Sequence, residues 1–210
     1  AEKVKDLQVK DGFLTKASGY QFYNTSKFTF ETLLADSANI ADNFEDYLNG
    51  FSDNVKDILH RMKFEDQIKT MKEGKVLYQV ISDFNSTKAD MSPENLVQRF
   101  SESYDEEAGA HFTSRDIIYL MCDLLVNSDK NAFASDGINK TVYDMTMGTS
   151  QMLTCMEERL KQFDNEAVVT TFGQEFNPFT FGIAKADMLI RGGDPNNMQF
   201  GDPLNADQVN

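Results

Sequence analysis

The sequence KTVYDMTMGTSQM, residues 140–152, decides the fold of the second half of this chain. Val142 and Tyr143 favour a strand that ends at Asp144, and Gly148 then allows a tight turn. Two hydroxyl residues after the glycine are candidate caps for a following helix: Thr149 and Ser150. The stretch therefore predicts a strand, a turn and a helix in succession.

An acidic residue follows the next predicted strand. Residues 167–172 are rich in strand formers and lead into FGQEFNP, residues 172–178, where Glu175 stands just past the strand's end. In doubly wound α/β folds an acidic residue at this place accepts hydrogen bonds from ribose hydroxyls, and ligands bind beyond the carboxyl ends of the strands. The two stretches together predict a site for a nucleoside cofactor.

Helices and strands alternate through the rest of this half. Helices are predicted after Thr113, after Gly148, and from Pro178 to the pair Gly192-Gly193, and a last strand spans residues 198–201. The order helix, strand, helix, strand, helix, strand is typical of an α/β fold with a parallel sheet. Three strands make only the first half of an ordinary doubly wound sheet.

The loop before the first of these helices has its own signal. Asp116 lies three residues after Thr113, which is the spacing of a capping box with Asp in place of Glu. Residues 110–113 then form a loop at a helix N-terminus. Such a place favours anions and offers free backbone N–H groups.

The first half of the chain has a different pattern. Apolar residues recur at spacings of three and four from residue 29 to residue 84, which predicts a helical bundle. Predicted breaks fall at 35–38, 50–52 and 74. Residues 1–27 carry glycines and a cluster of aromatic residues, and they favour an irregular or hairpin-like segment.

A polar stretch separates the two halves. NSTKADMSP, residues 85–93, contains the first proline of the chain and reads as a linker. The expected division is an N-terminal helical domain at residues 1–90 and an α/β domain at residues 91–210.

Composition restricts the possible partners and sites. The net charge of −14 has the wrong sign for a surface that neutralises nucleic-acid phosphates alone, so DNA binding requires a basic partner or a further segment. Acidic residues in the first half fall between the apolar ones and indicate a solvated helix face: Asp42, Glu45, Asp46 and Asp53. No metal site is predicted.

Two further features concern location. Cys122 and Cys155 each lie in an apolar helical pattern, which is typical of buried free thiols. No apolar run is long enough for a membrane span, and AEKVKDLQVK at the start lacks the apolar core of a signal peptide. We expect a cytoplasmic protein that does not enter a membrane.

Four segments, in order, resemble motifs of one family. AGAHFTSRDIIYLM (108–121), TVYDMTMGTSQML (141–153), FGQEFNPFTFGIAKADMLIRGG (172–193) and FGDPL (200–204) are similar to the cofactor motifs of the methylation subunit of type I restriction-modification systems. That subunit is an adenine-N6 DNA methyltransferase that uses S-adenosylmethionine. The helical first half is similar to the family's N-terminal helical domain, which packs against the specificity subunit and the DNA.

The resemblance implies a cofactor site and a fold. The fold is the first half of a Rossmann-like S-adenosylmethionine-dependent methyltransferase sheet behind a helical bundle. Glu175 takes the ribose hydroxyls and Asp202 the adenine amino group. Ala110, Phe112 and Thr113 hold the methionine end, Asp144 and Gly148 border the methionine and its sulfonium, and His111 is a residue of the same loop. The implied set is Ala110, His111, Phe112, Thr113, Asp144, Gly148, Thr149, Ser150, Glu175 and Asp202. On spacing alone, Thr113 and Asp144 cap or end elements and Asp202 is a turn residue before proline.

The sequence departs from the family pattern at two places. The usual turn D-P-A-C-G-T-G-G reads DMTMGTSQ at 144–151, where bulky side chains replace small ones near the cofactor. The catalytic motif N-P-P-[FY], whose Asn and aromatic ring grip a flipped adenine, does not occur in the 210 residues. The chain alone is therefore expected to be inactive.

Two functions from different classes remain. The first is the cofactor-binding portion of a site-specific DNA adenine-N6 methyltransferase, with DNA, a specificity subunit and a restriction subunit as partners. The second is a non-catalytic scaffold whose helical domain binds the specificity subunit. A methyltransferase that acts on protein or RNA is a weaker third, because it also needs an acceptor-side motif.

Overall fold

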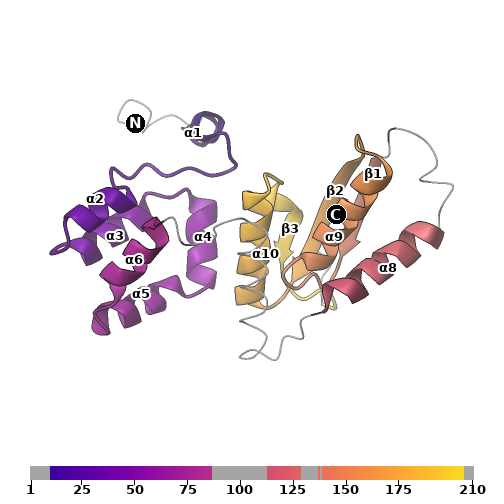
Figure 1. Cartoon of the computed structure of the whole chain (residues 1–210). Coiled ribbons are helices and arrows are strands. Elements are labelled where there is room, and N and C mark those ends of the chain that lie inside the picture. The colour runs from indigo at the N-terminus through magenta and orange to yellow at the C-terminus, as the bar shows by residue number, and fades with distance from the viewer. Residues whose placement is uncertain (1–9, 87–112, 129–136, 138, 206–210) are drawn as a thin grey trace. The chain divides into compact units, whose positions relative to one another are not determined.

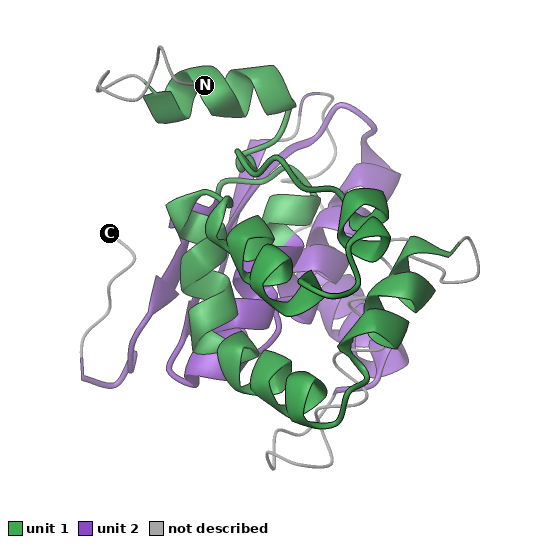
Figure 2. Ribbon diagram, turned by 90° about the vertical axis from the view of Figure 1, so that its left-hand side faces the viewer, with its two compact units in different colours: residues 1–96, 188–194 green, residues 97–187, 195–210 purple. Residues whose placement is uncertain are grey.

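The computed structural model describes residues 10–86, 113–128, 137 and 139–205. The chain divides into two compact units, Ala1–Leu96 with Met188–Asp194, and Val97–Asp187 with Pro195–Asn210 (Figure 2). The first unit contains the helical bundle and the second contains the sheet (Figure 1). The predicted division at residue 90 and the short helix predicted at 96–104 both lie outside the described residues.

The first unit is helical, as the apolar spacing predicts. Its described helices are α1 (Lys10–Ser18), α2 (Phe30–Ala35), α3 (Ile40–Asn49), α4 (Asp53–Arg61), α5 (Phe64–Glu73) and α6 (Leu77–Asn85). The breaks fall where they are predicted, and Lys63, with φ of 50°, adds one between α4 and α5. The apolar spacing gave no separate prediction of α5.

The prediction of an irregular N-terminal segment is wrong for residues 10–18 and is confirmed for residues 19–27, whereas residues 1–9 lie outside the described residues. Residues 10–18 form the helix α1 rather than an irregular or hairpin-like segment. This helix buries none of its residues, so no apolar stripe marks it in the sequence. Its end is held instead by the Ser18 hydroxyl, which donates to the Phe22 carbonyl oxygen at 2.7 Å.

One apolar cluster holds the helices of this unit together. It draws on α2, α3, α5 and α6, and its buried members are Leu33, Ile40, Phe44, Ile68, Leu77 and Ile81. Gly50, at the break after α3, is required by close approach, because a Cβ there would lie 2.7 Å from the Ser26 backbone nitrogen. The Thr25 N–H donates to the Gly50 carbonyl at 2.8 Å, which ties the segment before α2 to this break.

The second unit contains a three-stranded parallel sheet with strand order β1-β2-β3. Its described elements are α8 (Arg115–Ser128), β1 (Asn139–Asp144), α9 (Gln151–Phe163), β2 (Val168–Glu175), α10 (Pro178–Ile190), the 3-10 helix η3 (Pro195–Asn197) and β3 (Met198–Phe200). The last three residues of α10 belong to the first unit. The alternating order and the parallel pairing confirm the predicted α/β fold.

Two element boundaries differ from the prediction. The Ser114 carbonyl accepts the N–H of Ile118 at 3.1 Å, and α8 begins at Arg115. Ser114 therefore occupies the N-cap position, and the capping box predicted for Thr113 is wrong by one residue. Strand β2 also runs through Glu175, because Glu175 pairs with Phe200 of β3. That pairing depends on a strand about 25 residues further along the chain, and local strand propensity cannot predict it.

Helices α8 and α9 pack together through a buried apolar cluster. Its members are Ile118, Cys122, Val126, Cys155, Met156 and Leu160. Val142 of β1 and Val169 of β2 pack against this cluster, so it joins the two helices to the sheet. Both cysteines are free and buried, as predicted, and burial raises the pKa of the Cys122 thiol to about 11. They are protonated core residues near neutral pH.

Candidate cofactor site

The predicted site lies at the carboxyl ends of the parallel strands. Asp144 ends β1 and pairs in register with Gly173 of β2, two residues before Glu175. Asp202 follows β3 by two residues. Because the three strands are parallel, these carboxylates come from the same edge of the sheet.

Glu175 is bonded to the loops that follow all three strands. Its Oε2 accepts the Gly148 N–H at 3.0 Å, from the turn after β1. Its Oε1 accepts the Asn177 N–H at 2.7 Å, from the turn after β2. Its backbone carbonyl accepts the Gly201 N–H at 3.1 Å, from the segment after β3. This one residue therefore sets the relative positions of three loops.

The glycine turn between β1 and α9 is fixed by its backbone conformation and by hydrogen bonds. Gly148 has φ of 57° and Ser150 has φ of 67°, and the left-handed region at Gly148 suits a residue without Cβ. The Thr146 N–H donates to Asp144 Oδ1 at 3.0 Å, and the Met147 N–H donates to the Gln174 carbonyl at 3.1 Å. The turn is therefore anchored both to the end of β1 and to β2.

The two methionines of this turn have opposite environments. Met147 is only 4% exposed, whereas Met145 is 53% exposed. A Cβ built on Gly173 would lie 2.2 Å from Met147 Sδ, so the Met147 side chain occupies the space that a side chain at 173 would need. The bulky residue at 147 thus packs on β2.

Asp202 forms a local turn. Its Oδ1 accepts the Leu204 N–H at 2.9 Å, and its Oδ2 accepts from Asn205 Nδ2 at 2.6 Å. The side chain is exposed, so remaining acceptor positions face solvent. This is the turn geometry expected of an Asp before a proline, and it leaves the carboxylate accessible.

The other predicted residues divide into three groups. Asp144, Gly148 and Thr149 lie in or beside the glycine turn and are partly exposed. Ser150 is 2% exposed at the N-cap of α9 and makes no side-chain capping bond, so it shapes the turn through its backbone. Thr113 is exposed before α8. The motif residues before it lie outside the described residues: Ala110, His111 and Phe112.

Sequence reasoning missed two residues that build the site. Asn177 occupies the N-cap of α10, where its Oδ1 accepts the N–H groups of Phe179 at 3.0 Å and Thr180 at 3.1 Å. An Asn directly before a proline at the first helical position is a recognisable signal. Gly173 is the second, and an isolated glycine inside a strand signals the close approach of another group.

The arrangement has the features that a nucleoside requires. An ionised carboxylate offers about four lone-pair positions, and the two N–H donors at Glu175 use only part of them. Glu175 is half-buried, so its free positions are accessible to hydroxyl groups. A Cβ at Gly148 would meet no heavy atom within 4 Å, which shows open space beside the turn. The residues present therefore fit a ribose next to the turn.

Comparison with protein families assigns both halves of the chain. Residues 90–210 match the family model described as N-6 DNA Methylase. The chain belongs to the N-6 DNA methylase family. Residues 1–84 match the model described as HsdM N-terminal domain. The two models together place the chain among the methylation subunits of type I restriction-modification systems, which confirms the resemblance.

Two relatives agree with this assignment. The type I restriction enzyme HindI methylase subunit of Haemophilus influenzae is 29% identical over 100 residues, covering 47% of this chain and 20% of that protein. A crystal structure of the type I restriction-modification system methyltransferase subunit from Streptococcus thermophilus matches with a TM-score of 0.62 at 17% identity. That match covers 99% of this chain and 46% of the solved one. The N-6 DNA methylase chain therefore spans less than half of the length of these relatives.

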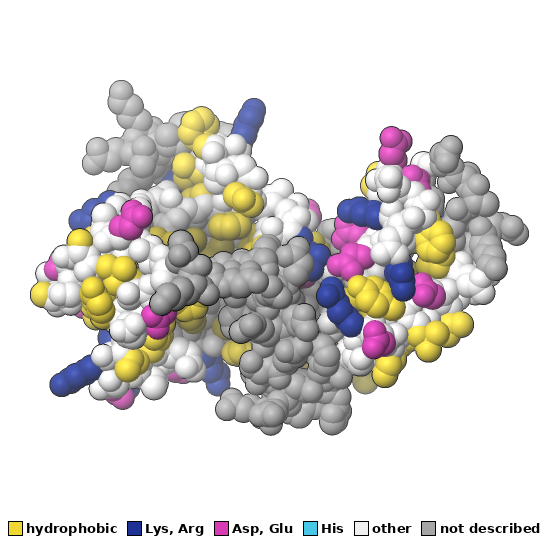
Figure 3. Space-filling model, in the orientation of Figure 1, with side chains coloured by type: hydrophobic (Ala, Val, Ile, Leu, Met, Phe, Trp, Pro, Cys, Tyr) yellow, Lys and Arg dark blue, Asp and Glu magenta, His cyan; other side chains and the backbone are white. Residues whose placement is uncertain are grey.

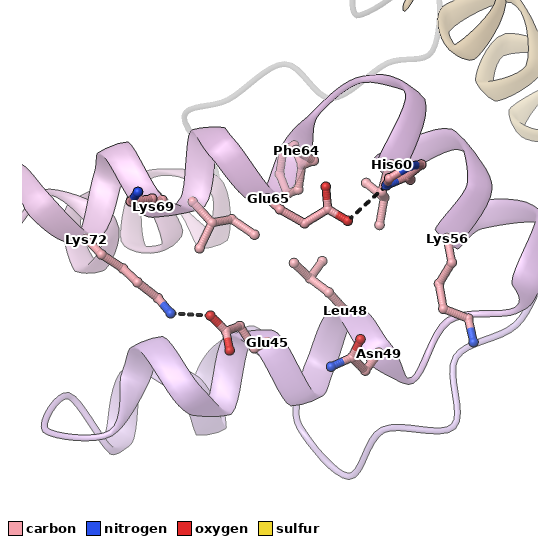
Figure 4. Close-up of a pocket in the computed structure, with 11 residues that line it drawn as sticks. Glu45, Leu48, Asn49, Lys56, His60, Phe64, Glu65, Lys69 and Lys72 are labelled. Carbon is pink, nitrogen blue, oxygen red and sulfur yellow. Dashed lines mark hydrogen bonds and ion pairs between the residues drawn. The ribbon is translucent and has the colours of Figure 1, made fainter. Parts of the chain in front are cut away.

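A groove opens in the helical unit of the chain, between α3, α4 and α5 (Figure 4). Its volume is about 610 Å³. Its lining residues are Glu45, Leu48, Asn49, Lys56, Leu59, His60, Phe64, Glu65, Ile68, Lys69 and Lys72. Glu45 is paired with Lys72, and Glu65 Oε1 lies 3.5 Å from His60 Nδ1. The groove combines an apolar floor with a rim that carries additional lysines.

A second surface feature is the outer side of α8. Large apolar side chains there are between 43% and 61% exposed: Ile117, Leu120, Met121, Leu124 and Leu125. Figure 3 shows apolar side chains gathered on the surface over α8. Apolar surface of this kind typically marks a contact with another segment or protein.

No helix among the described residues has the length and apolar character to cross a membrane. Nor do the described residues bring together three or more His, Cys, Asp or Glu side chains that could hold a metal ion.

Proposed function

We propose that this chain is the cofactor-binding portion of an S-adenosylmethionine-dependent DNA adenine-N6 methyltransferase, the modification subunit of a type I restriction-modification system. The proposal takes residues 1–90 as the helical domain and residues 91–210 as the cofactor-binding domain. Its partners in such a system are DNA, the specificity subunit and the restriction subunit. The observation that carries the proposal is Glu175, whose carboxylate stands among three loops at the carboxyl ends of the strands.

Each part of the proposed site has a defined task. Glu175 accepts hydrogen bonds from the ribose hydroxyls, and Asp202 accepts one from the adenine amino group. The glycine turn around Gly148 borders the methionine portion together with Asp144, Thr149 and Ser150. The loop at Ala110, His111, Phe112 and Thr113 holds the methionine end. When bound, S-adenosylmethionine supplies an electrophilic methyl group, and these residues bind and orient it.

Titration of the chain with S-adenosylmethionine tests the proposal. We expect weak binding, with a dissociation constant above about 1 μM, because Asp202 is exposed and Glu175 only half-buried, so water competes for both carboxylates. Amide resonances in nuclear magnetic resonance spectra should shift at Gly148 and Asn177, because both N–H groups share the Glu175 carboxylate. Saturating cofactor without a shift at either amide contradicts the proposal. Methionine alone is the control ligand, because it lacks the ribose and should leave Asn177 unchanged.

The groove in the helical unit supports a second candidate function, a scaffold that binds the specificity subunit. Leu48, Leu59 and Phe64 give the groove apolar surface from three helices, and Lys69 has no partner among the described residues. An amphipathic segment with acidic residues beside an apolar stripe matches this lining. The scaffold function does not compete with cofactor binding, because its surface lies in the helical unit.

Substitution in the groove tests the second candidate. Leu59→Lys places a charge on the apolar floor, and we expect the affinity for the specificity subunit of the same system to fall more than about tenfold. The measurement is co-purification followed by titration. Val76→Lys is the matched control, because Val76 is 46% exposed and does not line the groove. Equal affinities for Leu59→Lys and the unaltered chain exclude this groove as the docking surface.

A further inference from the structure

We propose that Met147 and Gly173 form a size-matched pair that holds the glycine turn and Glu175 in the geometry needed for the cofactor. Met147 is then a positioning residue of the site. The inference rests on the proposed function. Met147 and Gly173 lie within the motif segments, but neither is among the site residues that the family resemblance implies. It also gives a reason why this chain tolerates a large side chain in a turn where the family pattern has small ones.

The first step concerns space. Met147 Sδ lies where a side chain at 173 would begin, since a Cβ there would be 2.2 Å from the sulfur and 3.1 Å from Met147 Cβ. Leu153 Cδ1 would be equally close, at 3.1 Å. The absence of a side chain at Gly173 therefore leaves a space on β2 that the Met147 side chain fills and Leu153 borders. The Met147 side chain in this conformation and a side chain at position 173 exclude each other.

The second step concerns the backbone. The Met147 N–H donates to the Gln174 carbonyl at 3.1 Å, and the Gly148 N–H donates to Glu175 Oε2 at 3.0 Å. Two consecutive residues of the turn thus bond to two consecutive residues of β2, directly after the residue on which Met147 packs. The packing and the two hydrogen bonds fix the same stretch of turn on the same stretch of strand, so loss of the packing should loosen both bonds.

The turn supplies its own control. Met145 is 53% exposed, whereas Met147 is 4% exposed. The two residues have the same chemistry and lie two positions apart in one turn. An effect of the residue type in this turn would appear at both positions. An effect of the pair would appear only at Met147.

Hydrogen exchange of the Gly148 amide in the chain without cofactor tests the inference directly. Met147→Ala should raise this exchange rate at least about tenfold, because the bond to Glu175 opens more often. Met145→Ala should leave it unchanged, and Met147→Leu should retain most of the protection by refilling the space. If Met147→Ala leaves Gly148 exchange unchanged, or raises exchange at Leu160 in the core by the same factor, the inference is wrong. The second outcome would indicate a general loss of stability.

A double-substitution cycle tests the pairing. Gly173→Ala should expel the Met147 side chain, so it and Met147→Ala should each raise Gly148 exchange. The double variant Met147→Ala with Gly173→Ala should exchange no faster than the faster single variant, because both changes break one contact. If the Gly148 exchange rate of the double variant instead rises by the product of the two single effects, the pairing is wrong. These readings need no cofactor, so a chain that fails to bind S-adenosylmethionine contradicts the proposed function, whereas unchanged exchange contradicts this inference.

Discussion

Replacing Glu175 by alanine should weaken S-adenosylmethionine binding more than tenfold. Charge-assisted hydrogen bonds to the two ribose hydroxyls contribute about 1.5–3 kcal/mol, and about 1.4 kcal/mol corresponds to a factor of ten. The same substitution removes the acceptor for the Gly148 and Asn177 N–H groups, so the loops around the ribose also lose their shared anchor. The measurement is the dissociation constant from amide shifts during titration.

A matched variant separates the local effect from the loss of charge. Glu166→Ala removes one exposed carboxylate from the loop between α9 and β2 of the same unit, outside the proposed site. Its affinity should stay within about twofold of the unaltered chain, because exposed charges at a distance are screened. If the Glu175→Ala variant binds S-adenosylmethionine with unchanged affinity, a residue other than Glu175 contacts the ribose. A loss of equal size in Glu166→Ala would indicate an effect of net charge.

Replacing Leu160 by alanine should lower the free energy of unfolding of the sheet unit by about 2–5 kcal/mol. Leu160 is 2% exposed and belongs to the apolar cluster that joins α8, α9 and the sheet. The deletion leaves a cavity among side chains that cannot collapse without moving a helix. Urea denaturation should be followed by hydrogen exchange in α9 and β2, which reports on this unit separately from the helical bundle.

An exposed leucine of the neighbouring helix α8 is the control. Leu124 of α8 is 61% exposed, and Leu124→Ala should change the free energy of unfolding by less than about 0.5 kcal/mol. Both residues are helical leucines, so helix propensity affects the two variants alike. Equal destabilisation by the two substitutions would show that Leu124 is covered in solution. A small effect at Leu160 would contradict its place in the core.

Local sequence was sufficient for several features of the site. The run from Val142 to Gly148 and the acidic residue after the next β-forming run fixed a strand, a turn and a carboxylate at the sheet edge. These predictions depend on residue types that act over a few positions, such as glycine at positive φ and β-branched residues in strands. The helical bundle was predictable for the same reason, because its apolar stripes repeat with the helical period.

Some local features escaped prediction because their signals are weak. Helix α1 buries no side chain and so has no apolar stripe. Thr113 and Ser114 are both acceptable N-caps, and the helix uses the second. Propensity does not separate adjacent residues of similar type, so boundaries of this kind shift by a residue.

The sequence by itself determined the order of the helices and strands in the second half of this protein, the end of β1 at Asp144 and the turn at Gly148. Only the tertiary structure decided that Glu175 joins the loops after all three strands, and that Met147 packs in the space left by Gly173. Apart from the bond between Glu175 and Asn177, those contacts link residues 26 or 27 positions apart through parallel strand pairing. Their register depends on the packing of whole elements, which no local pattern of residues encodes.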